Sequence, residues 1–168
     1  MRRYVPWIGG IAGIWLSASA SAFSLPDWPP TLALDHTLVQ TSLLTRHFDP
    51  YPEHTNQQNL LSIELHNPDR WLAGAAWFKN SFDQPTWYFY AGREFPLWQF
   101  ADEINVRAKL TGGLLRGYQD EYRDKIPLNH LEVAPALLPS IGVQWGRVES
   151  DLIIFGTAGM MVTAGVRF

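Results

Sequence analysis

The chain has 168 residues, a length that fits a single domain. Hydrophobic residues make up 46% and aromatic residues 14%, whereas charged residues reach only 17%, below the fraction of about a quarter usual for soluble domains. The absence of cysteine excludes a disulfide scaffold, a thiolate metal site and a cysteine nucleophile. A formal charge of −3 without a basic run argues against a nucleic-acid partner, and the aromatic content argues against disorder.

Residues 1–22 have the organisation of a secretory signal peptide. Arg2 and Arg3 precede a short apolar stretch, and Ala20-Ser21-Ala22 matches the cleavage pattern of such signals. The apolar stretch is short for a membrane anchor, which is the alternative interpretation. Cleavage would remove two of the 13 basic residues and no acidic residue, leaving 11 basic against 16 acidic residues and a formal charge of −5. We therefore expect the mature protein to leave the cytoplasm.

The rest of the chain alternates with the period of β-strands. It contains no uncharged apolar stretch of about 18 residues, which argues against membrane helices. In residues 104–115, for example, apolar side chains fall mainly on one face, and Asn105, Arg107 and Lys109 fall on the other. The pattern predicts eight strands, at about residues 38–48, 59–66, 71–78, 86–95, 104–115, 132–145, 151–157 and 160–168.

Eight alternating strands fit two architectures, a soluble barrel or sandwich and a membrane barrel. A soluble barrel would have to expose several tryptophans or bury Arg107 and Lys109. The secretory signal, the tryptophan-rich strands and the terminal Phe168 favour an eight-stranded antiparallel transmembrane β-barrel over residues 41–168, in the bacterial outer membrane. Side chains fill a barrel of this size, which argues against bulk transport.

Strand parity brings a histidine and a serine to one rim of this barrel. Both termini of an even-stranded bacterial barrel lie on the periplasmic side, so His47 ends the first strand at the outer rim. The loop with His54 follows, and the third strand returns to the same rim at Lys79-Asn80-Ser81. A histidine base beside a serine hydroxyl is typical of acyl transfer. Taken singly, these residues are also explained as solvated loop or turn residues.

The predicted interior has two zones. Charged and polar side chains gather in the periplasmic half, where buried charges must pair and are expected to form an ion-pair plug: Glu64, His66, Glu94, Asn105, Arg107 and Arg167. The outer half is mostly apolar with several small residues and predicts an acyl-chain pocket, with a solidly packed core as the alternative: Leu60, Ser62, Gly74, Ala76, Phe78, Tyr88, Gly113 and Leu115. Gly92 falls where the two zones meet.

Pro135 and Pro139 flank a short stretch of one predicted strand. Proline cannot donate a hydrogen bond to a neighbouring strand, so this stretch predicts either an irregular strand start or a weakened seam. A seam of this kind would let a lipid enter the barrel sideways from the outer leaflet. Pro135 and Pro139 are therefore candidates for a lateral gate.

Two short segments resemble the PagP family of lipid A palmitoyltransferases. Phe78-Lys79-Asn80-Ser81 is similar to the family's Phe-Lys-Asp-Ser motif. Residues 135–146 are similar to its Pro-Val-Leu-Leu-Pro strand and the glycine-aromatic-glycine run that follows. The resemblance extends loosely from about residue 43 to Phe168. It implies an eight-stranded outer-membrane barrel that moves a palmitoyl chain from a phospholipid to a lipid A acyl-chain hydroxyl, with its site on the external side.

The resemblance also implies roles for individual residues. Ser81 matches the family serine, and Asn80 stands where the family has aspartate, which removes a charge; an asparagine can still orient an imidazole. Thr45-Arg46-His47-Phe48 is the nearest match to the context of the family histidine, with His54 second. An ungapped run from Ser81 places Gly92 on the glycine that forms the floor of the family's acyl-chain ruler.

The segment before the first strand departs from the family pattern. The family has an amphipathic helix there, whereas residues 23–40 contain three prolines and leave room for a short helix over 31–37 or an irregular segment. The first external loop is also short for the family. The chain therefore resembles a divergent member of the family. In such a member, the N-terminal helix that clamps the barrel in the membrane is abbreviated, and the donor or acceptor position can differ.

We therefore expect a monomeric outer-membrane acyltransferase with a phospholipid donor and a lipid A acceptor. His47 is the expected general base, Asn80 and Ser81 complete the catalytic group, and Phe78 and Tyr88 line the acyl-chain pocket. The histidines are not spaced as metal ligands, so no metal and no cofactor is expected. The alternatives are a structural or adhesin barrel, a barrel lipase or lipid A deacylase, and a small-solute transporter; the His-x-Ser motif of the deacylases is absent.

Overall fold

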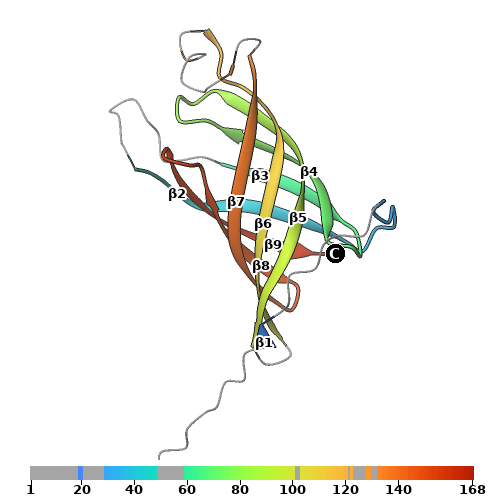
Figure 1. The fold of residues 1–168 in the computed structure, drawn as a ribbon. Coiled ribbons are helices and arrows are strands. Elements are labelled where there is room, and N and C mark those ends of the chain that lie inside the picture. The colour runs from blue at the N-terminus through green and yellow to red at the C-terminus, as the bar shows by residue number, and fades with distance from the viewer. Residues whose placement is uncertain are drawn as a thin grey trace, which may run out of the picture.

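The protein is a closed barrel of eight antiparallel strands, with a ninth, two-residue strand added outside it (Figure 1). The computed structural model describes residues 19–20, 29–48, 59–100, 103–120, 122, 128–129 and 132–168. The strands are β1 (Ser19–Ala20), β2 (His36–His47), β3 (Leu61–His66), β4 (Trp71–Lys79), β5 (Pro85–Phe100), β6 (Ile104–Arg116), β7 (Val133–Trp145), β8 (Val148–Ile154) and β9 (Gly159–Arg167). Across these ranges, no helix is long and apolar enough to cross a membrane.

Each strand from β2 to β9 pairs with its neighbour in the chain, and β9 returns to pair with β2. This last pairing closes the barrel. It extends along most of β2, from Leu38 opposite Arg167 to His47 opposite Gly159. Strand β1 pairs with the lower part of β5, where Ser19 lies opposite Gln99. The predicted eight-stranded antiparallel barrel is confirmed. The cleavage of residues 1–22, which contain β1, stays a prediction.

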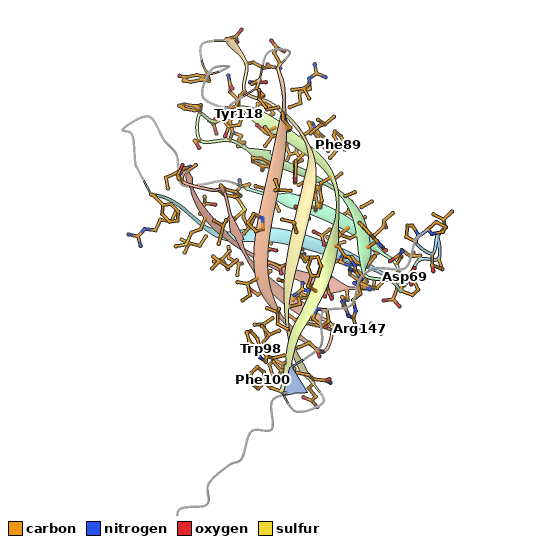
Figure 2. The ribbon with its side chains drawn as sticks, viewed as in Figure 1. Asp69, Phe89, Trp98, Phe100, Tyr118 and Arg147 are labelled. Atoms are coloured by element: carbon orange, nitrogen blue, oxygen red, sulfur yellow. The ribbon has the colours of Figure 1, made fainter. Side chains whose placement is uncertain are left out.

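Burial along each strand follows the alternation in the sequence, with polar side chains inside. On β3, Ser62, Glu64 and His66 are at most 4% exposed, whereas the apolar residues between them are 47–59% exposed. Further apolar and aromatic side chains are exposed on β5, β6 and β7, and Phe89 of β5 projects outward (Figure 2). The pattern is the reverse of a soluble barrel, in which the apolar faces of the strands point inward.

The segment before β2 is irregular, and the short helix considered for residues 31–37 does not form. Residues 30–35 have no regular secondary structure, and β2 begins at His36. The turn between β3 and β4 holds this segment instead: Thr31 donates its backbone N–H to Asp69 at 2.6 Å, and Asn67 donates its side-chain amide to the Thr31 carbonyl at 2.6 Å. The hydrogen bonds from Thr31 lower the pKa of the exposed Asp69 carboxyl.

In two places, strands that are neighbours in the barrel stop pairing before they reach one end of it. This end lies near the top of Figure 1, and we refer to it as the upper end. Strands β7 and β8 pair from Trp145 up to Ser140, and residues 133–139 of β7 pair only with β6 among the described strands. Strands β2 and β3 likewise pair only up to Thr41 opposite Leu61, while the rest of β2 continues beside β9. The barrel wall is therefore incomplete at two places near the upper end.

Candidate active site

A cavity of about 780 Å³ occupies the upper half of the barrel interior. Its wall is apolar where β4, β5 and β9 contribute Ala76, Tyr88 and Met161 and where Leu60 lies directly before β3. These four residues form the buried core of the protein. Phe78 packs against this core and also lines the cavity. Phe78 and Tyr88 therefore lie where the acyl-chain pocket was predicted. The volume lies within the range of about 300–1,000 Å³ that is typical of small-molecule sites.

His47 and Ser81 meet at the mouth of this cavity. His47 is the last residue of β2, and Ser81 begins the turn that follows β4, so 34 positions separate them in the chain. The Nε2 atom of His47 lies 2.8 Å from the Ser81 hydroxyl oxygen, and both side chains line the cavity. The pairing expected from strand parity is therefore present in the structure. His54, the second histidine considered, lies outside the described residues.

Asn80 holds the turn on which Ser81 lies. Its side-chain oxygen accepts hydrogen bonds from the backbone N–H groups of Phe82 (2.9 Å) and Gln84 (3.1 Å), and its amide donates to the Gly117 carbonyl at 3.1 Å. The side chain is only 1% exposed. Asparagine suits this place because its short amide replaces backbone hydrogen bonds in a turn. Asn80 therefore positions Ser81, and these bonds run to the turn and to Gly117 instead of the imidazole.

Gly92 faces inward from β5, as expected, but it does not line the cavity. Tyr90 and Thr111 are among the residues that line the cavity on this side. A Cβ atom at Gly92 would lie 2.3 Å from the Leu110 carbonyl oxygen and 2.9 Å from the Cα atom of Thr111. Both of these atoms belong to the backbone of β6. Glycine is therefore required here for the close approach of β5 and β6, and the role of Gly92 as the floor of an acyl-chain ruler stays a prediction.

A layer of paired charges closes the cavity at its lower end. Lys109 contacts Glu64 at 3.0 Å and Asp151 at 2.9 Å, and the Tyr90 hydroxyl donates to Glu64 at 2.9 Å. Arg107 lies deeper in the layer, where it pairs with Glu94 at 2.8 Å and also with Glu149 and Asp151. Five residues predicted for an ion-pair plug belong to this layer: Glu64, His66, Glu94, Arg107 and Arg167. Asn105, the sixth, is half-buried on β6.

The sequence prediction did not assign two acidic residues to the layer, and it placed β8 too late, which left one of them, Glu149, outside the predicted strand. The strand was expected at residues 151–157, whereas β8 runs from Val148 to Ile154. Glu149 and Asp151 are fully buried on its inward face. The alternation of Glu149, Asp151 and Ile153 with Ser150 and Leu152 is the signal that identifies this face.

The cavity opens sideways where β7 and β8 separate. Leu137 is 67% exposed on the outer surface of β7 and nevertheless lines the cavity, as does the exposed Pro135. Pro139 is the last residue of β7 before its pairing with β8 begins at Ser140. The two prolines therefore bracket the opening, which is the place predicted for a lateral gate.

The chemistry available at the mouth of the cavity is that of a hydroxyl next to a base. An imidazole in hydrogen-bonding contact with a serine hydroxyl can accept its proton and activate it, or another hydroxyl bound beside it, for attack on an ester. Within the described ranges, no group of three histidine or acidic side chains is arranged to hold a metal ion.

Comparison with known proteins leaves the family of the chain open. No protein-family model matches the sequence, and no curated protein matches it significantly. The site described above therefore rests on the barrel, its cavity and the contact between His47 and Ser81.

Proposed function

We propose that the protein is an outer-membrane acyltransferase that moves an acyl chain from a phospholipid to a hydroxyl group of lipid A. The observation that carries this proposal is the contact of 2.8 Å between His47 and Ser81 at the mouth of a deep apolar cavity. A base and a hydroxyl group at the mouth of an apolar cavity fit a substrate in which an ester joins a polar head group to an acyl chain. The resemblance of two segments to the PagP family supports the same reaction.

The outer surface of the barrel supports a location in a membrane. Exposed apolar side chains follow several strands, and exposed aromatic residues stand on β5 and near the turn between β7 and β8, including Trp98 and Trp145. Soluble monomers rarely expose apolar patches larger than a few hundred Å². A closed barrel with an apolar outer band and aromatic residues near its ends is typical of the bacterial outer membrane. In an outer-membrane barrel with both ends of its chain on the periplasmic side, the mouth with His47 would face outward.

In the proposed reaction, His47 accepts the proton of the attacking hydroxyl through Nε2. The hydroxyl oxygen forms a bond to the acyl carbon, and the bond from that carbon to the glycerol oxygen breaks. His47 then returns the proton to the glycerol oxygen, so that a lysophospholipid leaves. If the attacking hydroxyl is that of the acceptor, this single step completes the transfer. If it is that of Ser81, the lipid A hydroxyl attacks the acyl-serine ester in a second step: His47 takes the proton of the lipid A hydroxyl, the bond from the acyl carbon to the Ser81 oxygen breaks, and His47 returns the proton to Ser81.

The depth of the cavity suits a long acyl chain. Ser81 at the mouth is seven positions along the chain from Gly74, which lies opposite Glu64 of the floor. At about 3.3 Å per residue and a strand tilt near 40°, this corresponds to a depth of about 18 Å. The charges of the floor are paired with one another at the lower end of this space. A saturated chain such as palmitoyl is the proposed substrate.

The openings between strands offer the donor and acceptor a path from the membrane. A phospholipid in the outer leaflet would reach the cavity through the gap between β7 and β8, past Pro135 and Leu137. The second gap, between β2 and β3, lies on the side of the barrel from which His47 reaches the site. The lipid substrates would therefore never have to leave the bilayer.

Mass spectrometry of lipid A tests the proposed function directly. Cells that express the protein are expected to contain lipid A with one additional acyl chain, and cells without the gene are expected to lack this species. Lysophospholipid should accumulate in parallel, since each transfer leaves one behind. Free fatty acid without modified lipid A would indicate a lipase, and lipid A that loses a chain would indicate a deacylase. Unchanged lipids under expression would favour the adhesin or transporter alternatives and overturn the proposal.

Chain-length selection is expected to respond to Ala76 and not to Gly92. Ala76 is 3% exposed and lines the cavity opposite Tyr88, so Ala76→Leu should fill part of the space and favour shorter acyl chains. In Gly92→Ala, the new Cβ would meet the β6 backbone, so this variant should lose stability with its chain preference unchanged. Transfer from phospholipids with different chain lengths measures both effects. An unchanged preference in Ala76→Leu would argue against the cavity as the acyl-chain site.

A further inference from the structure

The lower part of the cavity is lined by neutral polar side chains that the proposed reaction does not use. Strands β2, β3, β7 and β9 contribute one buried side chain each, and we call these four residues the polar cluster: Gln40, Ser62, Ser140 and Thr163. They lie beside the charged layer, since Gln40 donates to Asp151 at 2.8 Å and Ser140 stands opposite Lys109 in the pairing of β6 with β7. The inner end of a bound acyl chain would therefore meet polar atoms.

The hydrogen bonds of the polar cluster are incomplete. The side chain of Gln40 contacts the hydroxyls of Ser62 and Thr163 at 3.4 Å each, which is long for such hydrogen bonds. Ser140 is only 8% exposed, and its hydroxyl makes no hydrogen bond with the residues that the structure describes. A buried hydroxyl without a partner costs free energy, so a polar atom of a ligand is stabilised beside it. The deep end of the cavity therefore offers hydrogen bonds that the protein leaves open.

The charges next to the polar cluster favour a neutral polar group over an acid. In the charged layer, Arg107, Lys109 and Arg167 pair with four carboxylates. A protonated His66 would only balance these charges, so the layer has no excess positive charge that would attract an anion. A hydroxyl group is neutral and can both donate and accept a hydrogen bond. It is therefore the group that fits the polar cluster.

We propose that the acyl chain selected by this cavity carries a hydroxyl group at its far end, an inference that rests on the proposed function and specifies its substrate. The ester of the donor lies at the mouth beside His47 and Ser81, and the methylene groups of the chain contact the apolar wall. The distal hydroxyl takes the open hydrogen bond of Ser140. No covalent bond forms or breaks at the polar cluster, so its residues select the chain and take no part in the proton transfer.

Competition between two donor phospholipids tests this selection. Both carry acyl chains of the same length, and one chain has a hydroxyl on its terminal carbon. In vesicles that also contain lipid A, the wild-type protein should transfer the hydroxylated chain about two- to tenfold faster, the effect of one net hydrogen bond. A hydroxyl in the middle of the chain should slow transfer instead, because it would lie against the apolar wall of Leu60, Ala76 and Met161.

The variant Ser140→Ala removes the hydroxyl that has no partner and changes the side-chain volume little. The ratio of the two transfer rates should then return to about one, while the unsubstituted chain is transferred at the wild-type rate. Ser150→Ala is the matched control, since it also removes a serine hydroxyl but from a position on β8 that does not line the described cavity. It should keep the wild-type preference.

Ether analogues of the two donors separate this inference from the proposed function, because an ether can bind but cannot be transferred. In calorimetric titrations of the purified barrel in detergent, the hydroxylated ether should bind more tightly by the same factor, and Ser140→Ala should lose the difference. Equal transfer of both esters together with equal binding of both ethers would overturn the inference alone. Preferred binding of the hydroxylated ether without transfer of either ester would overturn the proposed function and support the polar cluster as a binding site.

Discussion

Alanine at His47 or at Ser81 is expected to lower the rate of acyl transfer by about 10²–10⁴-fold, the usual contribution of a positioned base. The two side chains are 2.8 Å apart, and each variant removes one partner of the proton transfer. The double variant should be little worse than either single variant, because the two groups act as a unit. The measurement is the initial rate of lipid A acylation by purified protein in vesicles.

Ser150→Ala is the matched control for Ser81→Ala. The Ser150 hydroxyl also makes one hydrogen bond, to the Thr163 carbonyl at 2.9 Å, but it lies on β8 away from the mouth of the cavity. This variant should retain the wild-type rate. All variants should migrate as folded barrels in unheated gel samples. Full activity in both His47→Ala and Ser81→Ala would show that the chemistry takes place elsewhere.

Arg107→Ala is expected to cause the largest loss of stability in the protein, about 3–5 kcal/mol. Arg107 is 1% exposed and pairs with Glu94, Glu149 and Asp151, so its removal leaves three carboxylates without their shared cation in the barrel interior. Urea unfolding in lipid vesicles, followed by tryptophan fluorescence, measures the effect as a lower midpoint.

Arg147→Ala provides the control for this variant. Arg147 is exposed in the turn between β7 and β8 (Figure 2), and its loss should change the free energy of unfolding by less than about 0.5 kcal/mol. Adding Glu149→Gln and Asp151→Asn to Arg107→Ala should restore part of the lost stability, since these changes remove buried negative charge that Arg107 no longer neutralises. Equal midpoints for Arg107→Ala and Arg147→Ala would contradict the structural role of the charged layer.

The fold was predictable because a barrel wall repeats one simple rule. Side chains alternate between the two faces of a strand, so the pattern in residues 104–115 identified β6 to within one residue at its end. Strand ends were less predictable because turns follow a different chemistry. The helix considered for residues 31–37 failed for this reason: hydrogen bonds with the turn at Asn67 and Asp69 decide the conformation of that segment, and they come from a distant part of the chain.

The contact between His47 and Ser81 was predictable for the same reason, since parity takes both residues to one rim and adjacent hairpins lie side by side. Tyr118, which also lines the cavity, was not predictable in this way, because it lies beyond the end of β6, where alternation has stopped. Its position depends on Gly117 and on hydrogen bonds from Asn80 and Asn129. Parity placed Gly92 on the inward face of β5, but it could not show which side chains line the cavity there, because parity defines the face of a strand and not the depth to which neighbouring side chains fill the interior.

The pairing of β2 with β9 also has a consequence for when the protein becomes active. His47 lies on the first strand of the barrel and is aligned opposite Gly159 on the last one, whereas Ser81 lies on a turn between two middle strands. The base and the hydroxyl therefore acquire their places only after the final strand has been added. Under the proposed function, a chain still in transit would carry both His47 and Ser81 and yet would not transfer acyl chains from the phospholipids that it meets on the way.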